Sequence, residues 1–190
     1  MQPQSMSTRK YKIHTVGTAP EKCKAALQGV EQKFGFLPNI IGTMAESPVL
    51  VNGFVGVFGN FHGGSLTAGE KQVLLLTNAV TLRCPLTVAI HSTLGLHDGV
   101  PASEIAAIRS GHMPRDPKFA ALSALTKALI EKRGDVTEVD LERFLSAGYS
   151  SVQMLEVIAG VGVSTLAAFT AHAAAVPMDE RFKAQAWAAA

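Results

Sequence analysis

Residues 66–99 read LTAGEKQVLLLTNAVTLRCPLTVAIHSTLGLHDG. Residues that typically begin and end helices occur in this stretch at positions that predict two consecutive helices. Thr67, followed three residues later by Glu70, has the spacing of a capping box, which marks the beginning of a helix. Pro85 suits the first turn of a second helix, and Gly99 is placed to end it. The stretch therefore predicts a two-helix hairpin with a very short connection.

Helix signals continue on both sides of this hairpin, whereas alternating apolar and polar runs of β-branched residues are missing. A proline or a capping side chain is placed to begin further helices at Pro20, Ser47, Asp116 and Thr137. We therefore predict an all-α chain without a sheet. No linker, low-complexity segment or internal repeat divides residues 1–190, so a single domain is expected.

The composition limits the partners and the compartment. Hydrophobic residues make up 47% of the chain and charged residues only 17%, so we expect other copies of the chain to cover part of the surface. The formal net charge is +2 without a block of Lys or Arg, so nucleic acid is not expected as a partner. Cys23 and Cys84, in a chain without a secretory signal, are expected to be reduced thiols of a cytoplasmic protein.

One segment has the length and composition of a membrane span. Residues 157–177 contain no Asp, Glu, Lys or Arg. They do contain Ser164, Thr165, Thr170 and His172, and most of the others are small. We therefore expect no membrane span, but a soluble helix buried by its own domain and by neighbouring subunits.

The candidate chemistry lies at the start of the second helix of the hairpin. Cys84, Thr87 and His91 follow the spacing of one helical face, so they are candidates to line one pocket. The helix N-terminus and the neighbouring Arg83 would favour the thiolate form of Cys84. His91 should lean toward Thr87, whereas Cys84 lies two turns away, roughly 10 Å along the helix axis. Spacing alone leaves open that the cysteine and the histidine are ordinary core residues.

The histidines show no metal-binding pattern. No spacing places two imidazoles on one helical turn, and no carboxylate motif accompanies His62, His91, His97 and His112. We therefore expect neither a metal nor another cofactor.

The run from residue 66 to residue 111 resembles the core of the alkylhydroperoxidase D (AhpD) family, in the carboxymuconolactone decarboxylase superfamily. That core is a helix opening with Cys-x-x-Cys, with a histidine four residues after the second cysteine. Residues 34–50 and 131–182 resemble the longer, peroxidase-related branch, so the likeness covers about residues 20–187. The resemblance implies an AhpD-like helical bundle built around the hairpin, which assembles as a trimer or hexamer.

Two of the four positions matched to the family's catalytic residues carry another side chain. The first cysteine of the motif falls on Cys84 and its histidine on His91, but the second cysteine falls on Thr87. The glutamate that the peroxidases carry twelve residues before the first cysteine falls on Gln72. Thr87 forms no disulfide, and the Gln72 amide does not titrate as a carboxylate does. A dithiol peroxidase cycle within this motif is therefore excluded.

Three interpretations remain open. In the first, the chain is an AhpD-like, peroxidase-related oxidoreductase in which Cys84 acts as a single thiol with His91 on a hydroperoxide. A small thiol, another protein or Cys23 would then resolve the sulfenic acid. In the second, the chain is a decarboxylase-like lyase or other acid–base enzyme, in which His91 acts on a small carboxylate, lactone or enol. In the third, it is a non-catalytic oligomeric binding protein.

Two more residues are candidates for substrate binding. Arg83 is placed to hold a substrate carboxylate through paired hydrogen bonds, or it is an exposed surface residue. His172 matches a histidine that is usual in the peroxidase-related branch. It either approaches the pocket or bonds to a neighbouring subunit.

Overall fold

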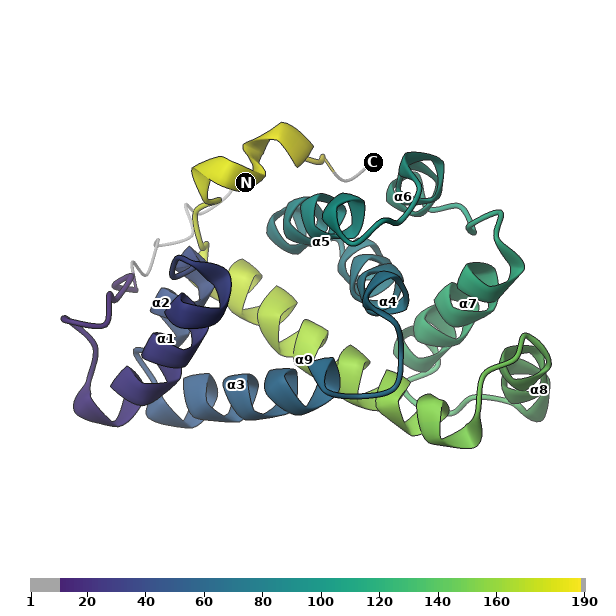
Figure 1. Cartoon of the computed structure of the whole chain (residues 1–190), viewed down its shortest axis with the longest axis horizontal. Helices are drawn as coiled ribbons and strands as arrows, with labels where there is room; N and C mark the ends of the chain where they lie inside the picture. Colours follow the sequence, from purple (N-terminus) through teal and green to yellow (C-terminus); the bar gives the residue numbers. More distant parts are fainter. Residues whose placement is uncertain (1–10, 189–190) are drawn as a thin grey trace, which may run out of the picture.

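The computed structural model describes residues 11–188, and the regular elements within that range are all helical. The prediction of an all-α chain is thus confirmed. Along the described part of the chain the elements are α1 (Glu21–Phe34), α2 (Asn39–Met44), α3 (Pro48–His62), α4 (Ala68–Thr81), α5 (Pro85–His97), α6 (Ala102–Arg109), α7 (Pro117–Glu131), α8 (Glu138–Ser146), α9 (Ser151–Ala174) and the 3₁₀-helix η1 (Glu180–Gln185) (Figure 1).

The predicted hairpin is formed by α4 and α5. Thr67 caps α4 by accepting a hydrogen bond from the backbone N–H of Glu70, whose side chain accepts one from Thr67 N at 2.8 Å. Pro85 is the first residue of α5. The chain reverses at Arg83, whose φ of 53° lies in the left-handed region. Cys84 follows as the N-cap of α5, with an extended backbone.

The centre of the fold is α4, of whose 14 residues 10 are buried. It packs against α5, α6, α7 and α9, which explains why it carries apolar residues on every side. Its buried charges are paired: Lys71 Nζ donates to two backbone carbonyls at 2.9 and 3.0 Å, and Glu70 lies 2.8 Å from Lys118 Nζ.

The long helix α9 crosses the molecule in contact with α2, α3, α4, α5 and α7 (Figure 1). Its close approach to α3 and α4 requires glycine at Gly160, because a Cβ there would lie 2.7 Å from Phe61 and 2.9 Å from Leu74. Within the described range, α9 is the one helix that is long and apolar enough to cross a membrane, and 39% of its most apolar window is buried. Its contacts with five other helices are those of a core helix.

One side of α9 carries exposed apolar side chains, and we refer to it as the outer α9 face. It consists of Val152, Leu155, Ile158, Leu166 and Phe169.

The chain ends in a strap, residues 177–187, which contains η1 and packs against α5 (Figure 1). At one end of the strap, Asp179 accepts a hydrogen bond from the backbone N–H of Asn39 at 3.1 Å. At the other end, the Arg109 guanidinium donates to two strap carbonyls at 3.0 Å, and the Trp187 indole N–H donates to Arg109 O at 2.9 Å. The C-terminal strap is therefore held at both ends.

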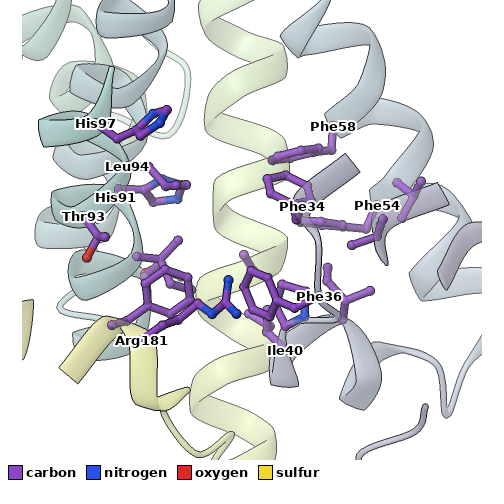
Figure 2. Close-up of a pocket in the computed structure, with 18 residues that line it drawn as sticks. Phe34, Phe36, Ile40, Phe54, Phe58, His91, Thr93, Leu94, His97 and Arg181 are labelled. Carbon is purple, nitrogen blue, oxygen red and sulfur yellow. The ribbon is translucent and has the colours of Figure 1, made fainter. Parts of the chain in front are cut away.

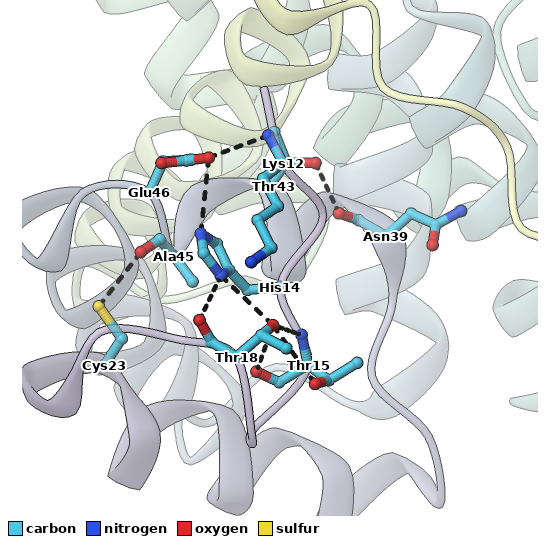
Figure 3. A network of polar contacts seen from close by, with 9 residues as sticks. All are labelled: Lys12, His14, Thr15, Thr18, Cys23, Asn39, Thr43, Ala45 and Glu46. Atoms are coloured by element: carbon cyan, nitrogen blue, oxygen red, sulfur yellow. Dashed lines mark hydrogen bonds and ion pairs between the residues drawn. The ribbon is translucent and has the colours of Figure 1, made fainter. Parts of the chain in front are cut away.

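A polar network around His14 ties the segment before α1 to α2 (Figure 3). His14 Nδ1 bonds to the carbonyl of Thr18 at 2.8 Å, and its Nε2 lies 3.5 Å from Glu46 Oε1. Glu46 also accepts a hydrogen bond from the backbone N–H of Lys12 at 2.9 Å.

The thiol of Cys23 is buried, and it donates a hydrogen bond to the backbone carbonyl of Ala45, at the end of α2, at 3.3 Å. Burial raises the pKa of this thiol. Cys23 thus links α1 to the C-terminal end of α2.

Candidate active site

A cavity of about 410 Å³ lies between α5 on one side and α1 and α3 on the other. Figure 2 shows His91 and His97 on α5, with Phe34, Phe54 and Phe58 facing them. The size is that of a site for a small molecule. Most of the lining is apolar, and it consists of Val30, Phe34, Phe36, Pro38, Ile40, Ile41, Phe54, Val55, Phe58, Thr87, Ile90, His91, Thr93, Leu94, His97, Ala167, Arg181 and Phe182.

His91 is the buried titratable group of this cavity, with 8% of its surface exposed. Its Nδ1 lies 3.1 Å from Gln72 Oε1. The Gln72 amide nitrogen donates to Asp98 Oδ2 at 3.0 Å, and a carboxylate accepts hydrogen bonds only. The amide orientation is therefore set by Asp98, so Gln72 Oε1 must accept from a protonated Nδ1. Neutral His91 then carries its lone pair on Nε2.

A row of hydrogen bonds extends from this imidazole to the end of α5. Asp98 accepts from Gln72 on one oxygen and lies 3.0 Å from His97 Nδ1 with the other. Negative charge at Asp98 polarises the Gln72 amide, which strengthens the amide oxygen as an acceptor for His91. Gln72 carries no charge, yet it connects the imidazole to the carboxylate of Asp98.

Burial keeps His91 uncharged. Desolvation, with a smaller effect from the charge of His62, lowers the pKa of His91 to about 3. The imidazole is therefore neutral at pH 7. A neutral imidazole in an apolar cavity can accept a proton from a bound molecule, and an anion bound beside it would raise its pKa.

Thr87 lies one turn before His91 and lines the same cavity. Its hydroxyl donates to the backbone carbonyl of Cys84 at 3.3 Å. The structure thus brings together Thr87, His91 and, through its hydrogen bond, Gln72.

Cys84 lies outside this group. Its exposed fraction is 0%, and it belongs to the hydrophobic core rather than to the cavity lining. As the N-cap of α5 it has φ −101° and ψ 100°, so the periodicity of the helix does not extend to its side chain. Cys84 and Cys23 are both free buried thiols.

Arg83 and His172 meet at the turn between α4 and α5, and neither lines the cavity. His172 Nε2 lies 3.2 Å from the backbone oxygen of Arg83, where the left-handed turn exposes that carbonyl. Within the chain, His172 therefore joins α9 to the hairpin turn.

No metal cluster is found within residues 11–188: no group of three or more His, Cys, Asp or Glu side chains is arranged to hold an ion.

No family model matches the chain, and no curated protein sequence matches it. Several solved structures, in contrast, do match this chain. A peroxidase-related protein from Ralstonia eutropha, described as an alkylhydroperoxidase AhpD core, is 17% identical and superposes with a TM-score of 0.80 over 94% of this chain and 96% of that one. A peroxidase-related protein from a Silicibacter species is 13% identical, with a TM-score of 0.77 over 96% of each chain. This chain has the AhpD fold.

The AhpD fold also occurs in the debrominase Bmp8. A cysteine-to-alanine variant of Bmp8 in complex with 2,3,4-tribromopyrrole is 17% identical to this chain, with a TM-score of 0.78 over 95% of this chain and 96% of that one. These likenesses show the AhpD-like helical fold that the sequence resemblance implied.

Within this AhpD fold, two residues of the site were not among the sequence-based candidates. Asp98 is the C-cap of α5, seven residues after His91, and its position directly before Gly99 at the end of the helix could be read from the sequence. Arg181 comes from the C-terminal strap, and its guanidinium carbon lies 3.4 Å from the centre of the Phe36 ring. Its place at the cavity depends on the path of the chain after α9, which no local pattern predicts.

Proposed function

We propose that this chain is an enzyme of the AhpD fold that uses neutral His91 as a general acid–base group in the apolar cavity. The observation that carries the proposal is the row of hydrogen bonds from Asp98 through Gln72 to His91 Nδ1, which leaves the lone pair on Nε2. The position of His91 in the cavity wall makes Nε2 the ring nitrogen available to a bound molecule.

The proposed step is a proton transfer. A C–H or O–H bond of the substrate breaks, the proton forms an N–H bond at His91 Nε2, and the electron pair moves into an adjacent carbonyl or ring. The imidazolium that forms donates from Nδ1 to Gln72, whose amide is polarised by Asp98. Returning the proton to the same or another atom completes an exchange or an isomerisation, and returning it after loss of CO₂ completes a decarboxylation.

The single-thiol peroxidase is the second candidate. It is supported by the position of Cys84 at the N-terminus of α5 and by the likeness to peroxidase-related proteins. In that reaction, the Cys84 thiolate attacks the peroxide, the O–O bond breaks, and an added thiol reduces the sulfenic acid. Because Cys84 is 0% exposed, the turn between α4 and α5 must first open. We therefore consider the peroxidase reaction less well supported than the acid–base reaction, because His91 already lies in the cavity wall.

Solvent-deuterium exchange tests the acid–base proposal without knowledge of the net reaction. The protein would be incubated in D₂O with carbon acids such as phenylpyruvate and α-angelica lactone, and proton NMR would follow loss of the acidic C–H signal above the uncatalysed rate. We expect exchange with the native protein and with Cys84→Ala, but not with His91→Gln.

A different pattern would contradict the proposal. Deuterium exchange that persists in His91→Gln excludes the acid–base role of His91. That role is also excluded if no carbon acid exchanges and the protein instead consumes peroxide in a reaction that requires Cys84. If neither exchange nor peroxide consumption is detected, the non-catalytic binding interpretation is favoured.

A further inference from the structure

The cavity combines an apolar wall with a single fixed positive charge. Among the described residues that line it, Arg181 is the only Lys or Arg, and none is an Asp or Glu. The remaining titratable lining residues are His91, which is neutral at pH 7, and His97, which pairs with Asp98. A bound molecule therefore meets one permanent cation and no permanent anion in the lining.

The guanidinium of Arg181 lies over an aromatic ring of the cavity wall. Its central carbon is 3.4 Å from the centre of the Phe36 ring, a cation–π contact that positions the cation at this side of the cavity (Figure 2). The neighbouring Phe182 is 5% exposed and forms part of the cavity wall. The two acidic residues that directly precede Arg181 have other hydrogen-bond partners. Glu180 forms an ion pair with Lys183, and both oxygens of Asp179 accept from the backbone N–H of Asn39, at 3.1 and 3.3 Å.

The exposure of Arg181 places it at the opening of the cavity, whereas His91 is buried. Opposite α5, the wall is aromatic: the rings of Phe54 and Phe58 stack with centroids 5.6 Å apart, and Phe34 lies 6.1 Å from Phe58 (Figure 2). Flat apolar surfaces of this kind favour a planar ring. A volume of about 410 Å³ is between two and three times the roughly 150 Å³ cavity that accommodates benzene, so one or two rings fit.

We propose that the cavity binds a small aromatic monoanion, with its carboxylate or enolate held by Arg181 at the opening and its ring between α5 and the phenylalanines. This arrangement directs the body of the molecule toward His91. The inference names the substrate class of the proposed acid–base site and rests on that function, but it makes a separate prediction about binding. It also assigns to Arg181 the anion-binding role that the sequence suggested for Arg83.

Matched pairs of ligands test the charge requirement. Isothermal titration calorimetry would compare 2-naphthoate with 2-naphthamide, and benzoate with benzamide. Charge-assisted hydrogen bonds to a guanidinium contribute a factor of roughly 10 to 100 in affinity, so we expect each anion to bind tighter than its amide by about that factor. Arg181→Gln should abolish this preference, and Arg181→Lys should retain part of it.

Two internal controls separate charge from folding. Lys183 lies on η1, is exposed and is not part of the cavity lining, so Lys183→Gln should retain the full preference for the anion. Binding of the two amides to Arg181→Gln should match that to the native protein, because the apolar wall is unchanged. Equal binding of anion and amide to the native protein, no binding of either anion, or a preference that persists in Arg181→Gln would overturn the proposal.

The binding experiment tests the role of Arg181 and the exchange experiment tests the role of His91, so either claim can be wrong without the other. If anions bind through Arg181 but His91→Gln does not alter deuterium exchange, the acid–base function is wrong and the anion site stands. If exchange requires His91 but the anion preference is missing, the function stands and the role of Arg181 is wrong.

Discussion

Gln72 Oε1 accepts a hydrogen bond from His91 Nδ1 at 3.1 Å. Replacing Gln72 with leucine removes this acceptor and also the donor to Asp98, leaving polar groups in a site that water reaches poorly. We expect Gln72→Leu to lower the free energy of unfolding by about 1–3 kcal/mol. Urea denaturation at pH 7 measures the change. Native-like stability would show that the amide is not required to pair these groups.

The pKa of His91 predicts how stability depends on pH. Its pKa is about 3 in the folded chain, below its ordinary value of 6.5, so the unfolded chain binds the proton more tightly. Burial also lowers the pKa of His62 to about 4. Their contribution to stability is therefore complete above about pH 6.5, and it declines as the pH falls toward 3.

Urea midpoints at pH 7, 5.5 and 4.5 test this dependence. We expect the midpoint to fall steadily over this range, and to fall less steeply in His91→Gln, which carries no titratable group at this position. A midpoint that is independent of pH, or an unchanged slope in the variant, would show that His91 titrates normally.

Burial of both thiols predicts slow chemical modification. Because Cys23 and Cys84 are each 0% exposed, neither should react with a thiol reagent within minutes in the native protein, and both should react after unfolding in urea. Intact-mass spectrometry after brief exposure to iodoacetamide measures this, and a parallel sample with an organic hydroperoxide and a sulfenic-acid trap measures oxidation. Rapid, stoichiometric labelling at Cys84 would instead favour the single-thiol peroxidase.

The outer α9 face predicts self-association. Its five exposed apolar side chains form one side of a long helix, and we propose that another copy of the chain covers them in a trimer or hexamer. Leu155→Glu or Phe169→Glu should lower the mass measured by light scattering at micromolar concentration. Val139 is 62% exposed on α8, so Val139→Glu is a matched control that should leave the mass unchanged. A native protein that is already monomeric would contradict the proposal.

Local signals predicted the framework of the fold well. Thr67 with Glu70, and Pro85, determine where α4 and α5 begin, because capping groups and proline act within one turn. The short helix α2 was not predicted. It has six residues and no side-chain cap, and its hydrogen bonds to the strap come from residues 138 to 140 positions away.

The candidate site was predictable only in part, for physical reasons. Thr87 and His91 share the cavity because both lie within α5, where helical periodicity applies. Cys84 precedes the helix with extended dihedral angles, so the same periodicity does not describe its side chain. Arg181 reaches the cavity through the C-terminal strap, whose position depends on contacts with Asn39 and Arg109 that lie far away in the sequence.

The acid–base proposal depends on His91 presenting an unprotonated Nε2 to the cavity. Nitrogen-15 NMR of the histidine-labelled protein at pH 7, with His91→Gln to assign the signals, measures the protonation of each ring nitrogen directly. We expect a neutral ring with the proton on Nδ1 and none on Nε2. A proton on Nε2, in either the other neutral tautomer or an imidazolium, would contradict the proposal.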